Sequence, residues 1–373
     1  MKIALVHDHL NSYGGGERVL EYLSQIWPEA PIYCLTYDPK NMPASFHSKD
    51  IRPSWLNRLP GMPKFFKWYL PLMPKAIESF DFSDFDVVLS DTSSFAKGVI
   101  THSTTKHICY LFTPTRYLTS DRVKYLKDAP IPRLIKPLMP LILGYLGRWD
   151  QKAAHRPDYL IAISRYIAQR TRRFYQRDPD KIIWPPVDSS FFRPSNTLGD
   201  YFLVVCRQEP YKRTDLAILA ANQLGLKLKV VGRGRLVEEY KKIAGPTVEF
   251  VGFVSDKELA KLYSHCLAFI FPPEEDAGMT PLEAMASGRP VIAYGAGGAL
   301  ESVIDGLTGL FFAHQTVESL VGALHSFDPG QYDSKKIRAH ALQFDKKIFQ
   351  SKIRRVVQKQ INQPSLDRFA QSR

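Results

Sequence analysis

The sequence predicts an α/β protein built from two doubly wound, Rossmann-like domains, and three observations support this fold class. Short apolar segments that are typical of buried parallel strands alternate with helical stretches in both halves of the chain. The 373 residues exceed what one hydrophobic core usually contains and fit two domains of ordinary size. The alternation also restarts after the rigid stretch WPPVD at 184–188, so a linker is expected near 185–197. We therefore expect a first domain over 1–190 and a second over 191–345.

The composition indicates a folded protein with a basic surface. Hydrophobic residues make up 45% of the chain, which argues against disorder. The formal net charge is +13, and most of the excess lies in residues 1–196, with 27 Lys and Arg against 18 Asp and Glu. Nucleic acid is not expected as a partner because no recognition-helix, zinc-finger or RNP pattern occurs. An anionic lipid surface is the other common partner of such a charge.

The cysteines and the N-terminus predict a cytoplasmic protein. The four cysteines lie far apart and form no C-x-x-C pair, so we expect free thiols in a reducing compartment. The first residues, MKIALVHDHL, pass from a short apolar strand into polar residues, which is unlike a secretory signal. No apolar run is long enough to span a bilayer.

In the first domain, strands are expected at 2–6, 32–34, 87–90, 107–112 and 159–163. The first of them leads into the loop NSYGGGE and a helix over about 17–27. Gly15 and Gly16 would let the backbone approach a ligand closely at this helix N-terminus. The G-x-G-x-x-G dinucleotide fingerprint is absent, and a plain turn is the alternative interpretation.

Two arginines follow strands of this domain, at the edge where doubly wound sheets bind ligands. Arg116 lies in TPTRY (113–117) and could bind an acceptor phosphate or pair with a surface acid. Arg165 follows Ser164, which is expected to cap a helix. It either faces the ligand or is an ordinary solvated helix residue.

Two segments of the first domain combine basic and aromatic side chains in a pattern that suits a bilayer interface. Residues 52–75 contain five basic residues, no acid and several aromatic rings, and 122–148 contain a single acid, Asp128. Such rings sit at headgroup level while Lys and Arg meet anionic lipid. We expect these segments to place the protein on the inner face of the cell membrane. The alternative is that they form helices that cover the core with snorkelling lysines.

The second domain is expected to open with a strand at 201–206, followed by strands at 228–232, 248–251, 267–271 and 291–294. Arg207 and Lys212 are five residues apart around a turn at the end of its first strand. Two cations at this position could hold a diphosphate and neutralise the charge that grows on it as it leaves. An ordinary surface turn is the alternative.

The stretch FPPEEDAGMTPLEAMASG at 271–288 predicts an anion site. Thr280 and Glu283 have the spacing of a capping box, so a helix is expected to start near Thr280. The amides of Gly278, Met279 and Thr280 would then face an anion at the helix N-terminus. Glu275 and Glu283 are carboxylates that could hold hydroxyl groups beside it.

The E-x7-E spacing of Glu275 and Glu283, followed by AMASGRPVIAYGAGGALESVIDGLTGLFF, resembles the retaining glycosyltransferases of family 4. The resemblance implies the GT-B fold, in which two Rossmann-like domains face a central cleft. It also implies that the basic amphipathic helix at 346–362 crosses back to the first domain. The chain most resembles the mannosyltransferases of O-antigen and exopolysaccharide assembly in the segments HDHL…GGGERVL, RWDQKAAHRPDYLIAISRYIA and WPPVD.

The resemblance also implies roles for individual residues. Glu275 would contact the hydroxyls of the transferred sugar, and Glu283 those of the ribose. The Gly278–Thr280 amides would bind the phosphates, and Arg207 and Lys212 (R-x4-K) would stabilise the departing diphosphate. The remaining assignments are the donor-facing Gly15 and Gly16, the base-flanking Gly252, Phe253 and Val254, and the acceptor-binding Tyr13, Arg116 and Arg165.

Two positions depart from the family pattern. The glycine that usually follows the lysine of R-x4-K is Arg213 in this chain. The histidine that usually lies over the donor sugar is Phe112, so His9 and His107 are the candidates for a replacement.

The expected function is retaining transfer of a hexose to a lipid-linked or growing polysaccharide acceptor, with mannose from GDP-mannose as the first choice of sugar and donor. No metal or other cofactor is expected because no D-x-D lies near a phosphate site. A UDP-hexose donor is the first alternative. Others are a GT-B epimerase or phosphorylase and an inactive module that binds nucleotide sugar or lipid.

Overall fold

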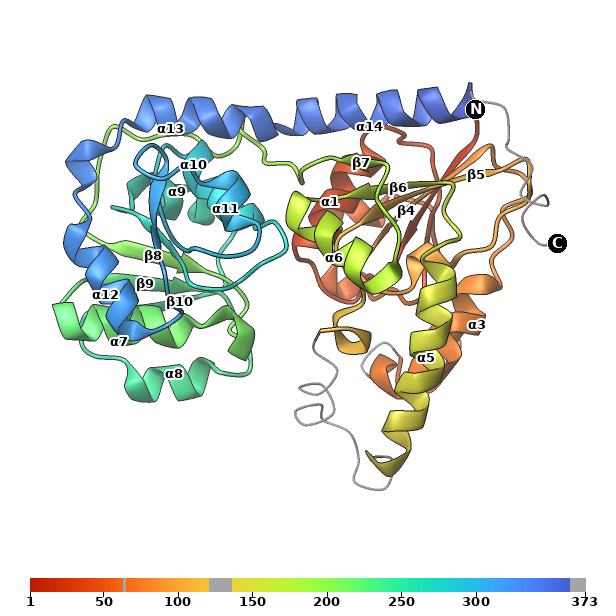
Figure 1. The fold of residues 1–373 in the computed structure, drawn as a ribbon, viewed down its shortest axis with the longest axis horizontal. Helices are drawn as coiled ribbons and strands as arrows, with labels where there is room; N and C mark the ends of the chain where they lie inside the picture. Colours follow the sequence, from red (N-terminus) through yellow and green to blue (C-terminus); the bar gives the residue numbers. More distant parts are fainter. Residues whose placement is uncertain (63–64, 121–135, 363–373) are drawn as a thin grey trace. The chain divides into compact units, whose positions relative to one another are not determined.

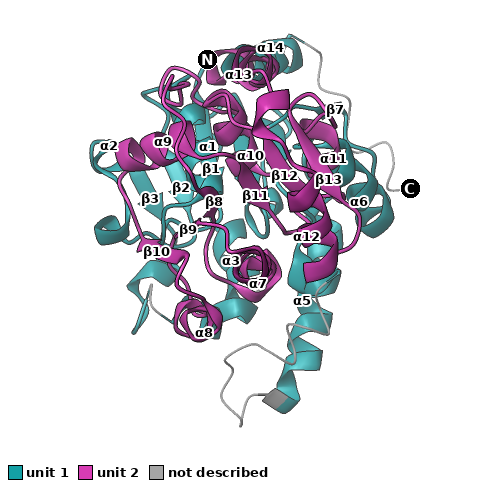
Figure 2. Ribbon diagram, turned by 90° about the vertical axis from the view of Figure 1, so that its left-hand side faces the viewer, with its two compact units in different colours: residues 1–184, 350–373 teal, residues 185–349 magenta. Residues whose placement is uncertain are grey.

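The computed structural model describes residues 1–62, 65–120 and 136–362, and they form two compact units (Figures 1 and 2). The first unit is Met1–Trp184 together with the chain from Gln350 onward, and the second is Pro185–Phe349. The unit boundary therefore falls once between Trp184 and Pro185 and once inside the last helix, α14 (Lys346–Ile361). Among the described residues, no helix has the length and apolar composition that a membrane span needs.

The first unit contains a parallel seven-stranded sheet in the order β3-β2-β1-β4-β5-β6-β7. Strand order reverses beside β1, so the carboxyl ends of β1 and β4 flank the switch point where such sheets bind ligands. The strands are β1 (Ile3–His7), β2 (Ile32–Cys34), β3 (Ile51–Pro53), β4 (Val87–Thr92), β5 (Lys106–Leu111), β6 (Tyr159–Ala162) and β7 (Lys181–Ile182). The α-helices are α1 (Gly15–Ser24), α2 (Ala44–His47), α3 (Met73–Glu78), α5 (Met139–Ala153) and α6 (Arg165–Tyr175). The 3-10 turns are η1 (Pro39–Asn41), η2 (Trp55–Arg58), η3 (Phe66–Leu72), η4 (Ala96–Gly98), η5 (Arg116–Leu118) and η6 (Lys136–Leu138).

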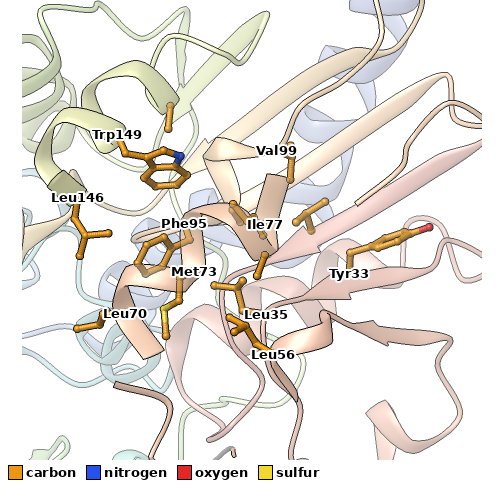
Figure 3. Close-up of a cluster of buried hydrophobic side chains, with 14 of the residues drawn as sticks. Tyr33, Leu35, Leu56, Leu70, Met73, Ile77, Phe95, Val99, Leu146 and Trp149 are labelled. Atoms are coloured by element: carbon orange, nitrogen blue, oxygen red, sulfur yellow. The ribbon is translucent and has the colours of Figure 1, made fainter. Parts of the chain in front are cut away.

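One face of this sheet packs against α3, α5 and the turns around them (Figure 3). Leu56, Leu70 and Met73 from the basic aromatic segment 52–75 are buried in this cluster, beside Leu146 of α5. Gly98 allows the Trp149 ring to lie against η4, because a Cβ atom there would collide with the ring. The segment thus has an inner face that belongs to the core, in addition to the exposed side chains considered below.

The second unit contains a parallel six-stranded sheet in the order β10-β9-β8-β11-β12-β13. Its strands are β8 (Phe202–Val205), β9 (Leu228–Val231), β10 (Val248–Gly252), β11 (Phe269–Phe271), β12 (Val291–Tyr294) and β13 (Gly309–Phe312). Its α-helices are α7 (Thr214–Leu224), α8 (Val237–Ile243), α9 (Asp256–His265), α10 (Met279–Ala286), α11 (Ala299–Ser302), α12 (Val317–Ser326) and α13 (Ser334–Ala341). The 3-10 turns are η7 (Pro210–Lys212), η8 (Pro329–Gln331) and η9 (Leu342–Phe344).

Alternate residues of these strands supply two separate cores, as expected for a sheet covered on both faces. Phe202, Ile270 and Ile292 pack with α7, α8 and α12. Leu203, Phe269 and Val291 pack with α9, α10 and α13. The carboxyl ends of β8 and β11 lie side by side where the strand order reverses, which places the loops after them at one edge.

Two expected helix starts are wrong. Helix α1 begins at Gly15 rather than Glu17, because the Glu17 carboxylate accepts a hydrogen bond from the Gly14 N–H (2.9 Å) and so closes the first turn from its third position. Helix α10 begins at Met279, and the capping box expected from Thr280 and Glu283 does not form. Its N-cap is Gly278, which has a φ of +83° and needs no side-chain cap to turn the chain into the helix.

Candidate functional site

The cation and carboxylate expected at the edge of the second sheet form an ion pair. Lys212 ends η7 after β8, and Glu275 lies in the loop between β11 and α10. Lys212 Nζ contacts Glu275 Oε1, with side chains that are only 17% and 15% exposed. Burial disfavours the charge of Lys212, but the Glu275 carboxylate more than offsets this and raises the pKa of the amine. Lys212 is therefore a fixed positive charge at neutral pH.

The N-terminus of α10 lies immediately after the Glu275 loop. Gly278 is the N-cap and has no side chain to cap the helix, and Met279 and Thr280 are the first two helical residues. These amides, together with the helix dipole, favour an anion. Glu283 lies one turn further along the helix and is 6% exposed.

The glycine pair Gly297–Gly298 packs against the loop that carries Glu275. This packing was not predicted from the sequence. The Gly298 N–H donates to the Glu275 carbonyl (2.8 Å). A Cβ atom at Gly297 would collide with the same carbonyl, and one at Gly298 would collide with the backbone of Ala277. The GG in the motif was the available signal, but only the contact between two loops explains it.

Arg213, the departure from the family glycine, has a left-handed backbone with a φ of +52°. A glycine is ordinary in this conformation, whereas an arginine needs other contacts to hold it. Its guanidinium pairs with Asp215 (2.9 Å) and lies 3.4 Å from the side-chain oxygen of Gln315. Gln315 in turn donates to the Pro272 carbonyl (2.9 Å), which connects this turn to the loop that carries Glu275.

The other assigned residues of the second unit, Arg207 and the loop 252–254, lie at the same edge of its sheet. Arg207 follows β8 and is exposed, and Gln208 beside it is buried and donates to the carbonyls of Cys206 and Val231. Gly252 has a φ of +78°, followed by Phe253, which is 68% exposed and lies under Arg233 (5.1 Å from guanidinium carbon to ring centroid). Val254 is partly buried against the core.

In the first unit, the glycine turn lies at the carboxyl end of β1. Gly15 and Gly16 are the first two residues of α1. The Phe112 ring lies next to Gly16, 3.5 Å from where a Cβ atom would be, and the His7 ring lies 3.7 Å from the same point. Phe112 thus reaches the turn that the family resemblance places against the donor.

Of the two histidines named as replacements, His107 is ruled out. It lies at the start of β5, is fully buried, and its Nε2 is 2.8 Å from the Ser90 hydroxyl. His9 follows β1, at the correct edge, and contacts the Thr36 hydroxyl and the Phe66 ring. Burial lowers the pKa of His9 to about 4, so it is neutral at pH 7.

The three residues assigned to the acceptor are also at the carboxyl edge of the first sheet. Arg116 and Arg165 follow the neighbouring strands β5 and β6, and Ser164 caps α6 as expected by accepting from the Ile167 N–H. The Tyr13 hydroxyl donates to Glu21 on α1.

A buried network fixes the backbone next to Arg116. Lys97 Nζ lies 2.6 Å from Asp150 Oδ1 and 3.0 Å from the Thr115 hydroxyl. The Tyr175 hydroxyl donates to Asp150 and accepts from the Thr115 N–H. Because a charge pair of this kind is costly to break, the loop that carries Arg116 has a defined position.

Comparisons with known proteins agree with this fold. The family model "Glycosyltransferase Family 4" matches residues 13–191, and the model "Glycosyl transferases group 1" matches residues 189–341. One similar solved structure is Anabaena Alr3699/HepE in complex with UDP and glucose, with a TM-score of 0.73 and 18% identity over 96% of this chain and 99% of that one. At this identity the likeness concerns the fold, which is GT-B.

The chain belongs to the family 4 glycosyltransferases. It is 33% identical to the alpha-1,3/1,6-mannosyltransferase ALG2 of Dictyostelium discoideum over 30% of this chain and 28% of that protein. It is 30% identical to the D-inositol 3-phosphate glycosyltransferase of Frankia alni over 37% of this chain and 42% of that protein. It is 31% identical to the GDP-mannose-dependent alpha-(1-6)-phosphatidylinositol monomannoside mannosyltransferase of Mycobacterium tuberculosis over 38% of this chain and 44% of that protein. The matched part thus spans less than half of each of these relatives.

Proposed function

We propose that the protein transfers a hexose from a nucleoside diphosphate sugar to an acceptor with retention of configuration. The observation that carries this proposal is the Lys212–Glu275 ion pair, whose Glu275 lies in the loop that leads to the glycine-capped N-terminus of α10. A cation and helix-start amides suit a diphosphate, and a carboxylate suits sugar hydroxyls.

Each of these groups would have a part in the reaction. The bond that breaks joins the sugar's anomeric carbon to the diphosphate, and negative charge accumulates on the departing oxygen. Lys212 and Arg207 would neutralise this charge while the α10 amides hold the phosphates. Glu275 would orient the sugar, and the acceptor hydroxyl would attack from the face that the diphosphate leaves and pass its proton to the departing diphosphate oxygen. This front-face route is an implication of the family resemblance and needs no protein nucleophile.

We propose mannose from GDP-mannose as the transferred sugar and donor. The support comes from the names of two relatives, the Dictyostelium and Mycobacterium mannosyltransferases. A UDP-hexose is the second candidate donor. Its support is the similarity in fold to Anabaena Alr3699/HepE, whose structure was solved in complex with UDP and glucose. No metal is proposed for the reaction.

The deciding experiment incubates the purified protein with GDP-mannose, UDP-glucose, UDP-galactose and UDP-N-acetylglucosamine and measures release of free sugar and nucleoside diphosphate. Slow hydrolysis of GDP-mannose alone is the expected result. Preference for a UDP-sugar would overturn the donor assignment. Conversion to another sugar nucleotide would indicate an epimerase, and phosphate-dependent release of sugar phosphate a phosphorylase. Binding without turnover would indicate an inactive module.

The acceptor is proposed to be lipid-linked and reached at an anionic membrane surface. Within the first unit, segment 52–75 exposes Trp55, Phe65, Trp68 (59% exposed) and Leu72. Leu138, Leu141 (73%) and Tyr145 are exposed at the start of α5, which extends away from the sheet in Figure 1. Residues 122–135, which are the first half of the second expected segment, lie outside the described part of the chain.

Vesicle co-sedimentation tests this membrane contact. Trp68→Ala is expected to weaken binding to vesicles of anionic phospholipid about tenfold, on the scale of the roughly 1.5 kcal/mol lost with a partly inserted aromatic ring. Leu219→Ala, which removes an exposed apolar side chain of α7 in the second unit, is the control and leaves binding unchanged. Equal binding by wild type and Trp68→Ala, or no binding to anionic vesicles at low salt, would contradict the proposal.

A further inference from the structure

His7 lies at the carboxyl end of β1, beneath the glycine turn Gly14–Gly16, and none of the roles proposed above uses it. Its side chain is 5% exposed. Nδ1 lies 3.0 Å from Asp91 Oδ2, and Nε2 lies 3.8 Å from Glu17 Oε1. An imidazole whose two nitrogens both face carboxylates is best satisfied when both carry a proton, which makes it a cation.

Glu17 connects this histidine to the turn. While Oε1 faces His7, Oε2 accepts the hydrogen bond from the Gly14 N–H (2.9 Å). Asp91, His7, Glu17 and Gly14 therefore form one chain of contacts that runs from β4 through β1 to the start of α1. The turn also rests on the His7 ring itself, at Gly16.

The charges around the ring favour its protonated form. Burial alone would lower the pKa of His7, but Asp91 and Glu17 reverse this and raise it well above the ordinary value. The other titratable groups that face it are Asp8 and His9 of the same segment. Asp8 accepts from the Thr92 hydroxyl and from the amides of Phe95 and Ala96, and His9 is neutral at pH 7.

We propose that His7 acts as a positioning residue, whose cationic ring holds Glu17 and through it fixes the Gly14–Gly16 turn against the donor. This inference rests on the proposed transfer reaction, because it assigns the turn to the nucleotide sugar. When His7 loses its proton at alkaline pH, Glu17 Oε1 loses its interaction with the charged ring. Glu17 then no longer fixes the Gly14–Gly16 turn. Activity should therefore fall as pH rises through the titration of His7.

The variant Glu17→Gln tests this directly. The amide oxygen of glutamine can still accept from the Gly14 N–H, but the negative charge beside His7 is gone. Histidine-selective 15N NMR should show both His7 nitrogens protonated through neutral pH in the wild type and deprotonation at lower pH in Glu17→Gln. The fall of kcat/KM on the alkaline side of its pH profile should shift to lower pH together with the deprotonation of His7. At pH 8, kcat/KM for the nucleotide sugar should drop about 10- to 100-fold, as a displaced reacting group costs.

The control is His102→Gln, which removes an exposed histidine that faces only Asp81 in the same unit. It should change neither the His7 titration nor the rate profile. His7→Gln should abolish the alkaline limb, and if this variant fails to fold, Glu17→Gln still decides the matter.

Two results would overturn the inference: a wild-type His7 that is neutral at pH 7, or a Glu17→Gln variant in which neither the titration nor the profile moves. The NMR titration needs no donor, so it is independent of the proposed reaction. If the wild type acts on no nucleotide sugar, the proposed function fails while the charge state of His7 is still measured. If the wild type is active and His7 titrates normally, only the inference fails.

Discussion

Lys212 and Glu275 occupy the part of the second unit on which the proposed reaction depends most. They are 63 residues apart in the chain and meet because β8 and β11 are neighbours in the sheet. The sequence allowed each to be assigned by its motif, but not their contact. An amine that stays charged despite burial can act on a departing diphosphate without a proton transfer.

Removing either side chain should slow transfer strongly. Lys212→Ala and Glu275→Ala are each expected to lower kcat by about 10²–10³-fold, equivalent to roughly 3–4 kcal/mol, because both act on charge that develops in the transition state. Lys227→Ala is the matched control, since Lys227 pairs with Asp200 on the surface of the same unit. Steady-state kinetics with the preferred nucleotide sugar give the answer. Near-normal turnover of Lys212→Ala would remove its assigned role.

Arg213 offers a test of backbone strain at a single residue. Substitution by either glycine or alanine removes the contacts with Asp215 and Gln315, but only glycine accepts a φ of +52° without strain. Arg213→Gly should therefore be more stable than Arg213→Ala by about 1 kcal/mol. Urea unfolding at constant pH measures the difference, and equal stability of the two variants would show that the backbone at 213 is not strained.

At the scale of elements, the loops after the strands carry the site and the glycines decide how they pack. The pair Gly297–Gly298 brings the loop before α11 against the backbone of Glu275 and Ala277. The sequence predicted Gly278, Met279 and Thr280 at a helix N-terminus, and they are the N-cap and the first two residues of α10, while their binding of an anion stays a prediction. The start of α10 was predicted at the wrong residue because the Thr280–Glu283 spacing suggested a capping box. Local sequence does not reveal that Gly278 has a positive φ and begins the helix.

Gly297→Ala and Gly306→Ala separate backbone strain from loop packing. Both glycines have a positive φ, of +61° and +72°, so backbone strain alone should cost each variant about 1 kcal/mol of unfolding free energy. A Cβ atom at Gly306 meets nothing within 4 Å, whereas one at Gly297 collides with Glu275. Activity should therefore fall only in Gly297→Ala, which differential scanning calorimetry and kinetics on the same samples can establish. Equal activity losses would contradict the packing argument.

At the scale of the whole molecule, the alternation of apolar strands and helices predicted two doubly wound sheets. Strands with a neighbour on both sides were easier to find: β2 and β12 have the bounds expected from their apolar runs. The strands β3, β7 and β13 were missed. Each is the edge of its sheet, and β3 and β7 are two or three residues long and largely exposed, so neither forms an apolar run. Contacts between loops, such as Gly298 with Glu275, depend on strand order and could not be predicted from local sequence.

Each unit of this molecule has its own hydrophobic core, so the second should fold alone. Residues 185–349 form a continuous segment with two apolar clusters on the faces of one sheet. Expressed by itself, this segment should unfold cooperatively on heating. It should also bind GDP or UDP, because Lys212, Glu275 and the α10 amides all belong to it, and isothermal titration calorimetry measures this binding. A broad, non-cooperative transition would show that its stability depends on the first unit.

The Lys212–Glu275 contact should also affect how fast the nucleoside diphosphate product is released. In the proposed reaction the Glu275 carboxylate would compete with the nucleoside diphosphate for the Lys212 ammonium group, and would so weaken binding of the nucleoside diphosphate that remains after the sugar has been transferred. Neutralising it, as in Glu275→Gln, should tighten binding of GDP or UDP even as turnover falls. The acid that orients the sugar would then also clear the site for the next molecule of donor.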